Sequence, residues 1–336
     1  MPVLNPQALI DNRVAAIRDM HQKAGQTRAE LDLSGGVDSA VMLGLLARAL
    51  GPENVTTIHL AINSNPDALA RARECANAFG VRLIEFDGTA LFDALITTMT
   101  ASMVAAGYKL EDIVGACEKD PTILGSIRST SRAPWGRAAN RLSGGGIRHG
   151  TGNEDEDRVL RFYQKGGDGE VDSNPISMLS KGEVFQLGIA LGVPRSILTA
   201  RPSPDLWGVG DNHNDEDEIG AYLGLKGCGI PFYSYVDVDT GKYKNVGLIE
   251  RLHRFCDTAA GKWLFLEPSA YLAASIEFAP KSPYFAGIPE SVVTTLLTNA
   301  RRVEAATRHK MNPNCPALGD RESMIDAGIL TNELPV

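Results

Sequence analysis

Segments typical of helices alternate with short apolar runs typical of buried strands over the first 90 residues. The runs, of which the second is rich in β-branched residues, are residues 29–33, 55–62 and 81–86. The segments with helical spacing of apolar side chains are residues 4–24, 40–50 and 67–79. This alternation predicts an α/β fold, a doubly wound parallel sheet with helices on both faces. Ligands of such sheets bind outside the carboxyl ends of the strands.

Composition and charge exclude several classes of protein. The 336 residues carry 33 basic and 41 acidic side chains, a net charge of −8 that disfavours binding to nucleic acid. No apolar run approaches the roughly 18 residues of a membrane span, and the start of the chain does not resemble a secretory signal. The five cysteines are widely spaced without a CxxC pair, which predicts free thiols in a reducing cytoplasm.

The hexapeptide SGGVDS follows the first predicted strand and opens a predicted helix. Its members are Ser34, Gly35, Gly36, Val37, Asp38 and Ser39. Glycines let the backbone approach a polyanion, and the start of a helix offers free N–H groups. The lysine of a Walker A loop is missing, and the carboxylate of Asp38 suggests a magnesium ligand instead. The simpler alternative is a capped strand–helix turn.

The hexapeptide resembles the loop of the PP-loop ATP pyrophosphatase superfamily, whose members adenylate a substrate with ATP. Residues 150–181 are similar to the corresponding run of NAD synthetases, and so are residues 202–207, the acidic turn 215–218 and the pair His309-Lys310. The resemblance covers about residues 31–310. It implies the adenine nucleotide alpha hydrolase-like fold with a helical C-terminal elaboration, magnesium and ATP as cofactor and co-substrate, and a homodimer.

The resemblance also implies roles for individual residues. Beside residues 34–39, those expected to contact ATP are Thr151, Lys181 and Ser203. The expected magnesium ligands are Asp38 and Glu156. The expected contacts of the acid substrate, nicotinic acid adenine dinucleotide (deamido-NAD), are Arg132, Lys165, Asp172, His309 and Lys310. The residues expected to take part in catalysis are Asp38, Lys181, Asp172 and Asp168.

The implied reaction adenylates a carboxylate, and ammonia then displaces AMP to leave an amide. Lysines, backbone N–H groups and magnesium stabilise the charge that grows on the leaving pyrophosphate. Asp172 or Asp168 is a hypothetical proton acceptor for ammonium. The alternatives are an amide ligase for another carboxylic acid, a tRNA-modifying enzyme and a nucleotide sensor without turnover. About 30 residues precede the hexapeptide, so we expect no fused glutaminase, and ammonia that is free or comes from a separate protein.

Four features depart from the family pattern. Asp32 stands where the family has glycine, and residues 144–149 are glycine-rich where it has an apolar strand. The substrate-gripping segment of the family survives only as a degenerate stretch, 125–132, within a basic region (125–141) that we predict to be irregular. Residues 227–289 match no family motif, and they form either a surface subdomain or a lid over the acid pocket.

These features predict three parts of the chain. Residues 1–226 form the nucleotide-binding domain, residues 227–290 an insertion or subdomain, and residues 291–336 a helix with the His-Lys pair and a tail. Helical spacing further predicts helices at residues 91–107, 180–191 and 291–309.

Overall fold

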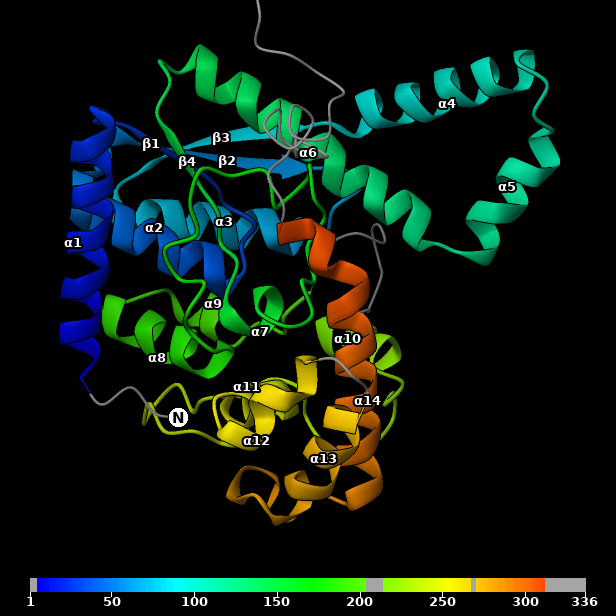
Figure 1. Cartoon of the computed structure of the whole chain (residues 1–336). Helices are drawn as coiled ribbons and strands as arrows, with labels where there is room; N and C mark the ends of the chain where they lie inside the picture. The colour runs from blue at the N-terminus through cyan, green and yellow to red at the C-terminus, as the bar shows by residue number, and fades with distance from the viewer. Residues whose placement is uncertain (1–4, 204–213, 267–269, 312–336) are drawn as a thin grey trace, which may run out of the picture.

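The computed structural model describes residues 5–203, 214–266 and 270–311. Within them a sheet of four parallel strands has the order β3-β2-β1-β4 (Figure 1). The strands are β1 (Ala29–Asp32), β2 (Val55–Ala61), β3 (Arg82–Asp87) and β4 (Ile147–His149). Ala29 pairs with Val55 on one side and with Ile147 on the other. The predicted parallel α/β fold is confirmed.

One face of the sheet is apolar and carries the larger core. The helices on this side are α1 (Pro6–Ala24), α2 (Val37–Leu50), α3 (Pro66–Phe79) and α8 (Lys181–Leu191) (Figure 1). Leu31 and Leu33 point into it because alternate residues of a strand face the same side. Fully buried leucines of α2 and α8, such as Leu45 and Leu187, complete the packing. The apolar spacing of these segments predicted their helices to within a few residues.

The other face of the sheet is covered by α6 (Thr122–Leu142) through a polar layer. Arg148 of β4 is 2% exposed and binds Glu30 (Nη1–Oε1 2.5 Å) and Asp32 (Nη2–Oδ2 2.6 Å) of β1. Gly136 of α6 lies directly over this guanidinium, since a Cβ on Gly136 would stand 1.9 Å from Arg148 Nη1. The helix therefore approaches the sheet closely because residue 136 has no side chain.

The prediction that residues 125–141 are irregular is wrong, because they lie within the continuous helix α6. The residues that α6 buries are small or polar, so no apolar stripe marks its inner face: Gly125, Ser129, Ser131, Ala133, Gly136 and Asn140. Pro134 is a further signal against a helix, and it lies exposed. The glycine-rich segment that follows does form a strand, β4, but one of three residues only.

Helices build the second half of the chain around a second core. They are α7 (Glu154–Asp157), α9 (Arg195–Leu198), α10 (Asp215–Tyr222), α11 (Leu248–Cys256), α12 (Ala259–Lys262), α13 (Ala270–Phe278) and α14 (Glu290–Thr307). Val159 and Leu160 join this core together with buried side chains of α11 and α14. The C-terminal elaboration is therefore helical, as expected, whereas the tail beyond residue 311 lies outside the described residues.

Two further helices, α4 (Thr89–Ala105) and α5 (Leu110–Lys119), project from the body of the molecule as an arm (Figure 1). Phe92 is the one residue of the two that is buried. Among the helices that the structure describes, none is long and apolar enough to cross a membrane.

We expect Gly136→Ala to destabilise the protein by about 3 kcal/mol, because its methyl group displaces the buried guanidinium of Arg148 from its carboxylates. Gly115→Ala is the matched control, since Gly115 lies in helix α5 with open space around it. It should stabilise by about 0.5–1 kcal/mol. Denaturant unfolding of both variants measures the two effects, and equal values would contradict the close approach of α6.

Candidate active site

The hexapeptide 34–39 forms a tight loop between β1 and α2. Ser34 Oγ accepts a hydrogen bond from the N–H of Gly36 (3.2 Å) and lies 3.0 Å from Ser39 Oγ, which donates to the carbonyl of Gly36 (3.0 Å). Gly35 has φ +85°, and a Cβ there would stand 2.3 Å from the carbonyl oxygen of Ala68. No side chain caps α2, so its first N–H groups are available to an anion.

This loop lies at the topological switch point of the sheet. The chain runs from β1 outward through β2 to β3 and then returns to β4 on the other side of β1. The loops after β1 and β4 therefore diverge and leave a crevice between them. Asn153, in the loop after β4, donates to Asp38 Oδ1 (2.9 Å) and caps α7 by accepting from the N–H of Glu156 (3.2 Å).

Lys181 joins the two sides of the crevice. It is the first residue of α8, whose start is fixed by a capping box between Ser180 and Glu183. Its Nζ lies 2.7 Å from Asp38 Oδ2 and 2.9 Å from Glu156 Oε1, and its side chain is 2% exposed. Burial disfavours the ammonium, but the carboxylates of Asp38 and Glu156 outweigh it and raise the pKa of Lys181 well above its usual value. The predicted residues Asp38, Glu156 and Lys181 therefore meet.

Carboxyl groups outnumber cations around this lysine. Burial, together with nearby carboxylates of which Glu156 contributes most, raises the pKa of Asp157 to about 8. Burial also raises the pKa of Asp215 to about 7, although Lys181 opposes the shift. A divalent cation would relieve this excess of negative charge, and carboxylate oxygens are the donors that magnesium takes beside phosphate oxygens. Asp38 and Glu156 thus fit a magnesium ion.

Asp157 and Asp215 had no assigned role in the sequence analysis. Both were visible in acidic clusters (154–157 and 215–218), but such clusters are usually solvated helix starts. Only the fold shows that these two carboxyl groups are turned inward.

The predicted acid-side residues Asp168 and Asp172 hold the loop 163–174 in place. Asp172 accepts from the backbone N–H of Arg148 (2.8 Å) and from Arg137 (3.2 and 3.3 Å). Burial opposes the charged form, but these two donors prevail and lower the pKa of Asp172. Asp168 accepts from Ser129 Oγ (2.9 Å) and from the N–H of Gln164 (2.8 Å).

Arg132 lies on α6 at the sheet face that carries Asp32. Burial raises the pKa of Asp32, against the opposing charges of Arg148 and then Arg132. Lys165 is half-buried in the same loop as Asp168. The structure thus gathers the acid-side candidates of α6 and of loop 163–174 beside the crevice.

Other predicted contacts lie apart from this cluster or have structural partners. Lys310 Nζ donates to the carbonyls of Arg161 (2.8 Å) and Tyr163 (2.5 Å), and His309 is exposed with Nδ1 3.0 Å from the carbonyl of Ala306. Thr151 is half-buried in the loop after β4. Ser203 is exposed, and the motif residues 204–207 that follow it lie outside the described residues.

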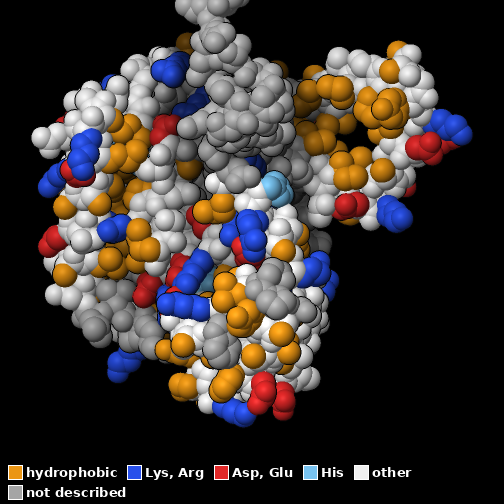
Figure 2. Space-filling model, in the orientation of Figure 1, with side chains coloured by type: hydrophobic (Ala, Val, Ile, Leu, Met, Phe, Trp, Pro, Cys, Tyr) orange, Lys and Arg blue, Asp and Glu red, His pale blue; other side chains and the backbone are white. Residues whose placement is uncertain are grey.

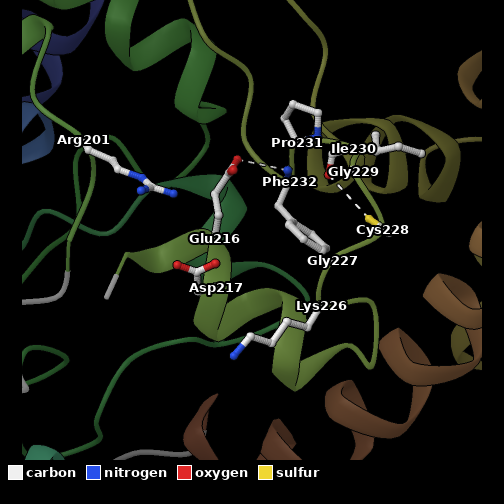
Figure 3. Close-up of a pocket in the computed structure, with 10 residues that line it drawn as sticks. All are labelled: Arg201, Glu216, Asp217, Lys226, Gly227, Cys228, Gly229, Ile230, Pro231 and Phe232. Carbon is white, nitrogen blue, oxygen red and sulfur yellow. Dashed lines mark hydrogen bonds between the residues drawn. The ribbon is translucent and has the colours of Figure 1, made fainter. Parts of the chain in front are cut away.

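A cavity of about 230 Å³ lies between the start of α10 and the loop 226–232 (Figure 3). Glu216 spans it by accepting from the N–H groups of Phe232 (3.0 Å) and Tyr233 (2.9 Å). Arg201, Asp217 and Lys226 line the rest, so the cavity is polar with mixed charge.

Comparison with known proteins places this chain in a family. The family model "NAD synthase" matches residues 9–227. An NH(3)-dependent NAD(+) synthetase of Trichlorobacter lovleyi is 32% identical over 235 residues, which are 69% of this chain and 73% of that protein. The protein of the same name from Carboxydothermus hydrogenoformans is 30% identical over 71% of this chain and 88% of its own. The chain belongs to the NAD synthase family. The resemblance seen in the sequence is confirmed.

Solved structures extend the likeness beyond the family-model match. NMN synthetase from Francisella tularensis superposes with a TM-score of 0.63 at 18% identity, covering 94% of this chain and 100% of that one. NAD+ synthetase from Burkholderia pseudomallei superposes with a TM-score of 0.53 at 20% identity, covering 92% and 91%. At these identities the likeness shows the fold alone, and it confirms the PP-loop fold for this NAD synthase family member.

A buried pair of histidines, His21 and His149, links α1 to β4 and to Ser173 in this NAD synthase family member. His21 Nδ1 lies 3.0 Å from the carbonyl of Gln26, His21 Nε2 lies 2.9 Å from His149 Nε2, and His149 Nδ1 lies 2.8 Å from Ser173 Oγ. Burial lowers the pKa of both histidines and keeps the rings neutral. Because the carbonyl can only accept, a neutral His21 is protonated on Nδ1, and His149 is then protonated on Nε2. Burial, with the nearby His21 adding to it, lowers the pKa of His149 to about 4.

We expect this pair to make the protein less stable in acid. The unfolded chain takes up a proton on residue 149 near pH 6.5, whereas the folded chain resists it until about pH 4. Its contribution to the unfolding free energy is therefore complete above pH 6.5 and falls by about 3 kcal/mol down to pH 4. Unfolding curves at several pH values should show a shallower acid decline in His149→Gln than in the wild type. His309→Gln, at an exposed position, should keep the wild-type slope.

Proposed function

We propose that this protein is an ammonia-dependent ligase that adenylates the carboxylate of deamido-NAD with ATP and then aminates it to NAD. The observation that carries the proposal is the buried ammonium of Lys181 between Asp38 and Glu156, beside an open helix N-terminus. That arrangement suits the polyphosphate of ATP, because an ammonium group and free N–H groups converge on one crevice, where a magnesium ion would offset the surrounding carboxylates.

In the proposed adenylation, the substrate carboxylate attacks the α-phosphorus and pyrophosphate leaves. The N–H groups of loop 34–39 and the hydroxyls of Ser34 and Ser39 bind the leaving phosphates. Lys181 turns away from Asp38 and Glu156 and toward the negative charge that grows on the leaving phosphates. A magnesium ion held by Asp38 and Glu156 would neutralise part of the same charge. Thr151 and Ser203 are the further candidates for contact with the nucleotide.

In the proposed amination, ammonia attacks the acyl adenylate and AMP leaves. We place the acid substrate along α6 and loop 163–174, where Arg132 and Lys165 supply positive charge. Asp172 and Asp168 remain the candidate proton acceptors, but the lowered pKa of Asp172 makes it the weaker base. His309 and Lys310 remain candidates for the far end of the dinucleotide. Ammonia is either free or delivered by a separate protein.

We expect purified protein with Mg-ATP, ammonium and deamido-NAD to release AMP and pyrophosphate and to form NAD, identified by mass. Chelation of divalent cations should abolish turnover. Lys181→Met should lower kcat/KM at least about 100-fold, because the charge on the leaving group loses its buried cation. Met178→Leu, at an exposed site, is the control.

Two outcomes would redirect this proposal. AMP release with nicotinic acid mononucleotide but not with deamido-NAD would make the protein an amide ligase for a different acid, as would turnover with another heteroaromatic carboxylate. Tight binding of Mg-ATP without turnover on any of these acids would favour a nucleotide sensor.

We also propose that two copies of the chain associate through the arm formed by α4 and α5. Apolar side chains are exposed along α4 at helical spacing (Leu91, Leu95 and Met99) and continue onto α5 (Leu110 and Val114). Figure 2 shows hydrophobic side chains as orange patches on the projecting arm. Asp93 is the one charged residue in the 17 residues of α4. A helix this apolar is stable when it is covered, and a second copy of the arm offers a matching surface.

We expect a dimer mass in light scattering and a monomer mass for the double variant Leu95→Glu with Met99→Glu, since charges oppose burial of the arm. Met178→Glu introduces a charge at an exposed apolar site outside the arm and should leave the dimer intact. A double variant that stays dimeric would contradict the assignment of the interface.

Two further expectations remain proposals. The four cysteines in the described residues are free thiols, which agrees with the reducing cytoplasm proposed as the location. The division of the chain at residues 226 and 290 is the other expectation that remains a proposal.

A further inference from the structure

The segment that matches no family motif, residues 227–289, reaches the phosphate side of the crevice. Tyr233 lies in this segment and is 0% exposed. The Nζ of Lys181 stands 5.0 Å from the centroid of its ring. An ammonium over an aromatic face is attracted by the partial negative charge of that face, most strongly when water is excluded. Lys181 thus contacts the ring of Tyr233 as well as the carboxylates of Asp38 and Glu156.

The ring of Tyr233 is held in place by its own backbone. Its N–H donates to Glu216 (2.9 Å), and its carbonyl accepts from Asn245 Nδ2 (2.8 Å). The phenol oxygen is buried and has no hydrogen-bond partner among the described residues. The ring face is therefore the part of Tyr233 that contacts Lys181.

Helix α11, in the same segment, forms ion pairs with the short helix α7, which carries Glu156, and with Arg158 directly after it. Arg254 pairs with Glu154, and Asp257 at the end of α11 pairs with Arg158 (2.5 Å). These are ion pairs between two short elements that are about 100 residues apart in sequence. Val159 and Leu160, directly after α7, are buried in the core that α11 helps to build.

A third contact links α11 to the backbone of Lys181. His253 Nδ1 lies 3.4 Å from Asp155 Oδ1, and both side chains are 0% exposed. The other oxygen of Asp155 accepts from the backbone N–H of Lys181 (3.1 Å). These contacts run from α11 through α7 to the start of α8.

The cluster of Glu154, Asp155 and His253 has the geometry of a metal site, but its charges argue otherwise. Glu154 is already paired with the guanidinium groups of Arg158 and Arg254. Two guanidinium groups beside a candidate ligand repel a second cation. Within the cluster, the ion pair of Glu154 with Arg254 links α7 to α11, whereas Asp155 Oδ1 and His253 are in contact without a hydrogen bond.

We propose that Tyr233 and α11 are positioning elements of the active site, which hold Lys181 and Glu156 where ATP reacts. The proposal rests on the proposed function, since the role of Tyr233 follows from the role of Lys181. It gives residues 227–257 a role in positioning the active site rather than that of a surface subdomain or a lid.

The test compares Tyr233→Leu with Tyr233→Phe. We expect the leucine variant to lower kcat/KM for ATP about tenfold, because the ring face behind Lys181 is lost, and the phenylalanine variant to stay within about twofold of the wild type. Leu297→Ala removes a fully buried side chain from the same core. It should lower the melting temperature while keeping kcat/KM within about twofold. Equal losses in the Tyr233→Leu and Leu297→Ala variants, or none in Tyr233→Leu, would overturn the proposal.

A second pair of variants covers the case in which Tyr233→Leu does not fold. Arg254 is 21% exposed and is not one of the apolar side chains of the second core, so its replacement removes no packing from that core. Arg254→Met should lower kcat/KM for ATP about fivefold, and Arg254→Lys should recover most of it, because the lysine restores a cation opposite Glu154. Wild-type activity in Arg254→Met would contradict the role of α11.

The wild type separates a failure of this proposal from a failure of the proposed function. If it releases no AMP with any acid, the proposed function fails. The positioning role of Tyr233 is then tested by measuring the binding of Mg-ATP alone by calorimetry. Binding about tenfold weaker in Tyr233→Leu, with Tyr233→Phe like the wild type, still supports the positioning role, whereas equal binding in all three proteins overturns it.

Discussion

The site depends on one buried ammonium group held by two carboxylates. Taking the charge of Lys181 out of water is unfavourable, and Asp38 and Glu156 offset this cost only if both stay within hydrogen-bond distance. The three residues come from α2, α7 and α8, so the contact fixes the relative positions of three helices. In the proposed reaction both carboxylates are metal ligands, and this contact holds them close to each other in the free protein.

The polar layer under α6 likewise fixes the position of the residues proposed to bind the acid substrate. A buried pair such as Arg148 with Glu30 contributes little net stability, since desolvation offsets much of the attraction. It does determine position. The backbone N–H of Arg148 binds Asp172, so the layer connects β1 and β4 to the loop that carries the acid-side candidates. Asp32, which departs from the family pattern, is the second carboxylate on Arg148 and thus belongs to this connection.

The sequence predicted what depends on neighbours along the chain and missed what depends on packing. The loop 34–39 and the helices of the first core have local signals, namely glycines before a helix and apolar residues at helical spacing. Helix α6 has neither, because it packs on charged groups through Gly136. Tyr233 and His253 could not be assigned from sequence either. Their partners, Lys181 and Asp155, lie some 50 to 100 residues away, and no pattern in residues 227–289 marks a contact with them.

The two cores explain why the elaborated half of the chain cannot be a passive addition. Val159 and Leu160 belong to the second core, although they follow directly on the helix that carries Glu156. Conversely, Val236 of the unmatched segment is buried in the first core. Each core therefore borrows side chains from the other half, and the crevice with Lys181 lies where they meet. Removing the second half would expose the apolar face beside α7 and the ring side of Lys181 to water, which weakens the electrostatic interactions on which the proposed role of this lysine depends.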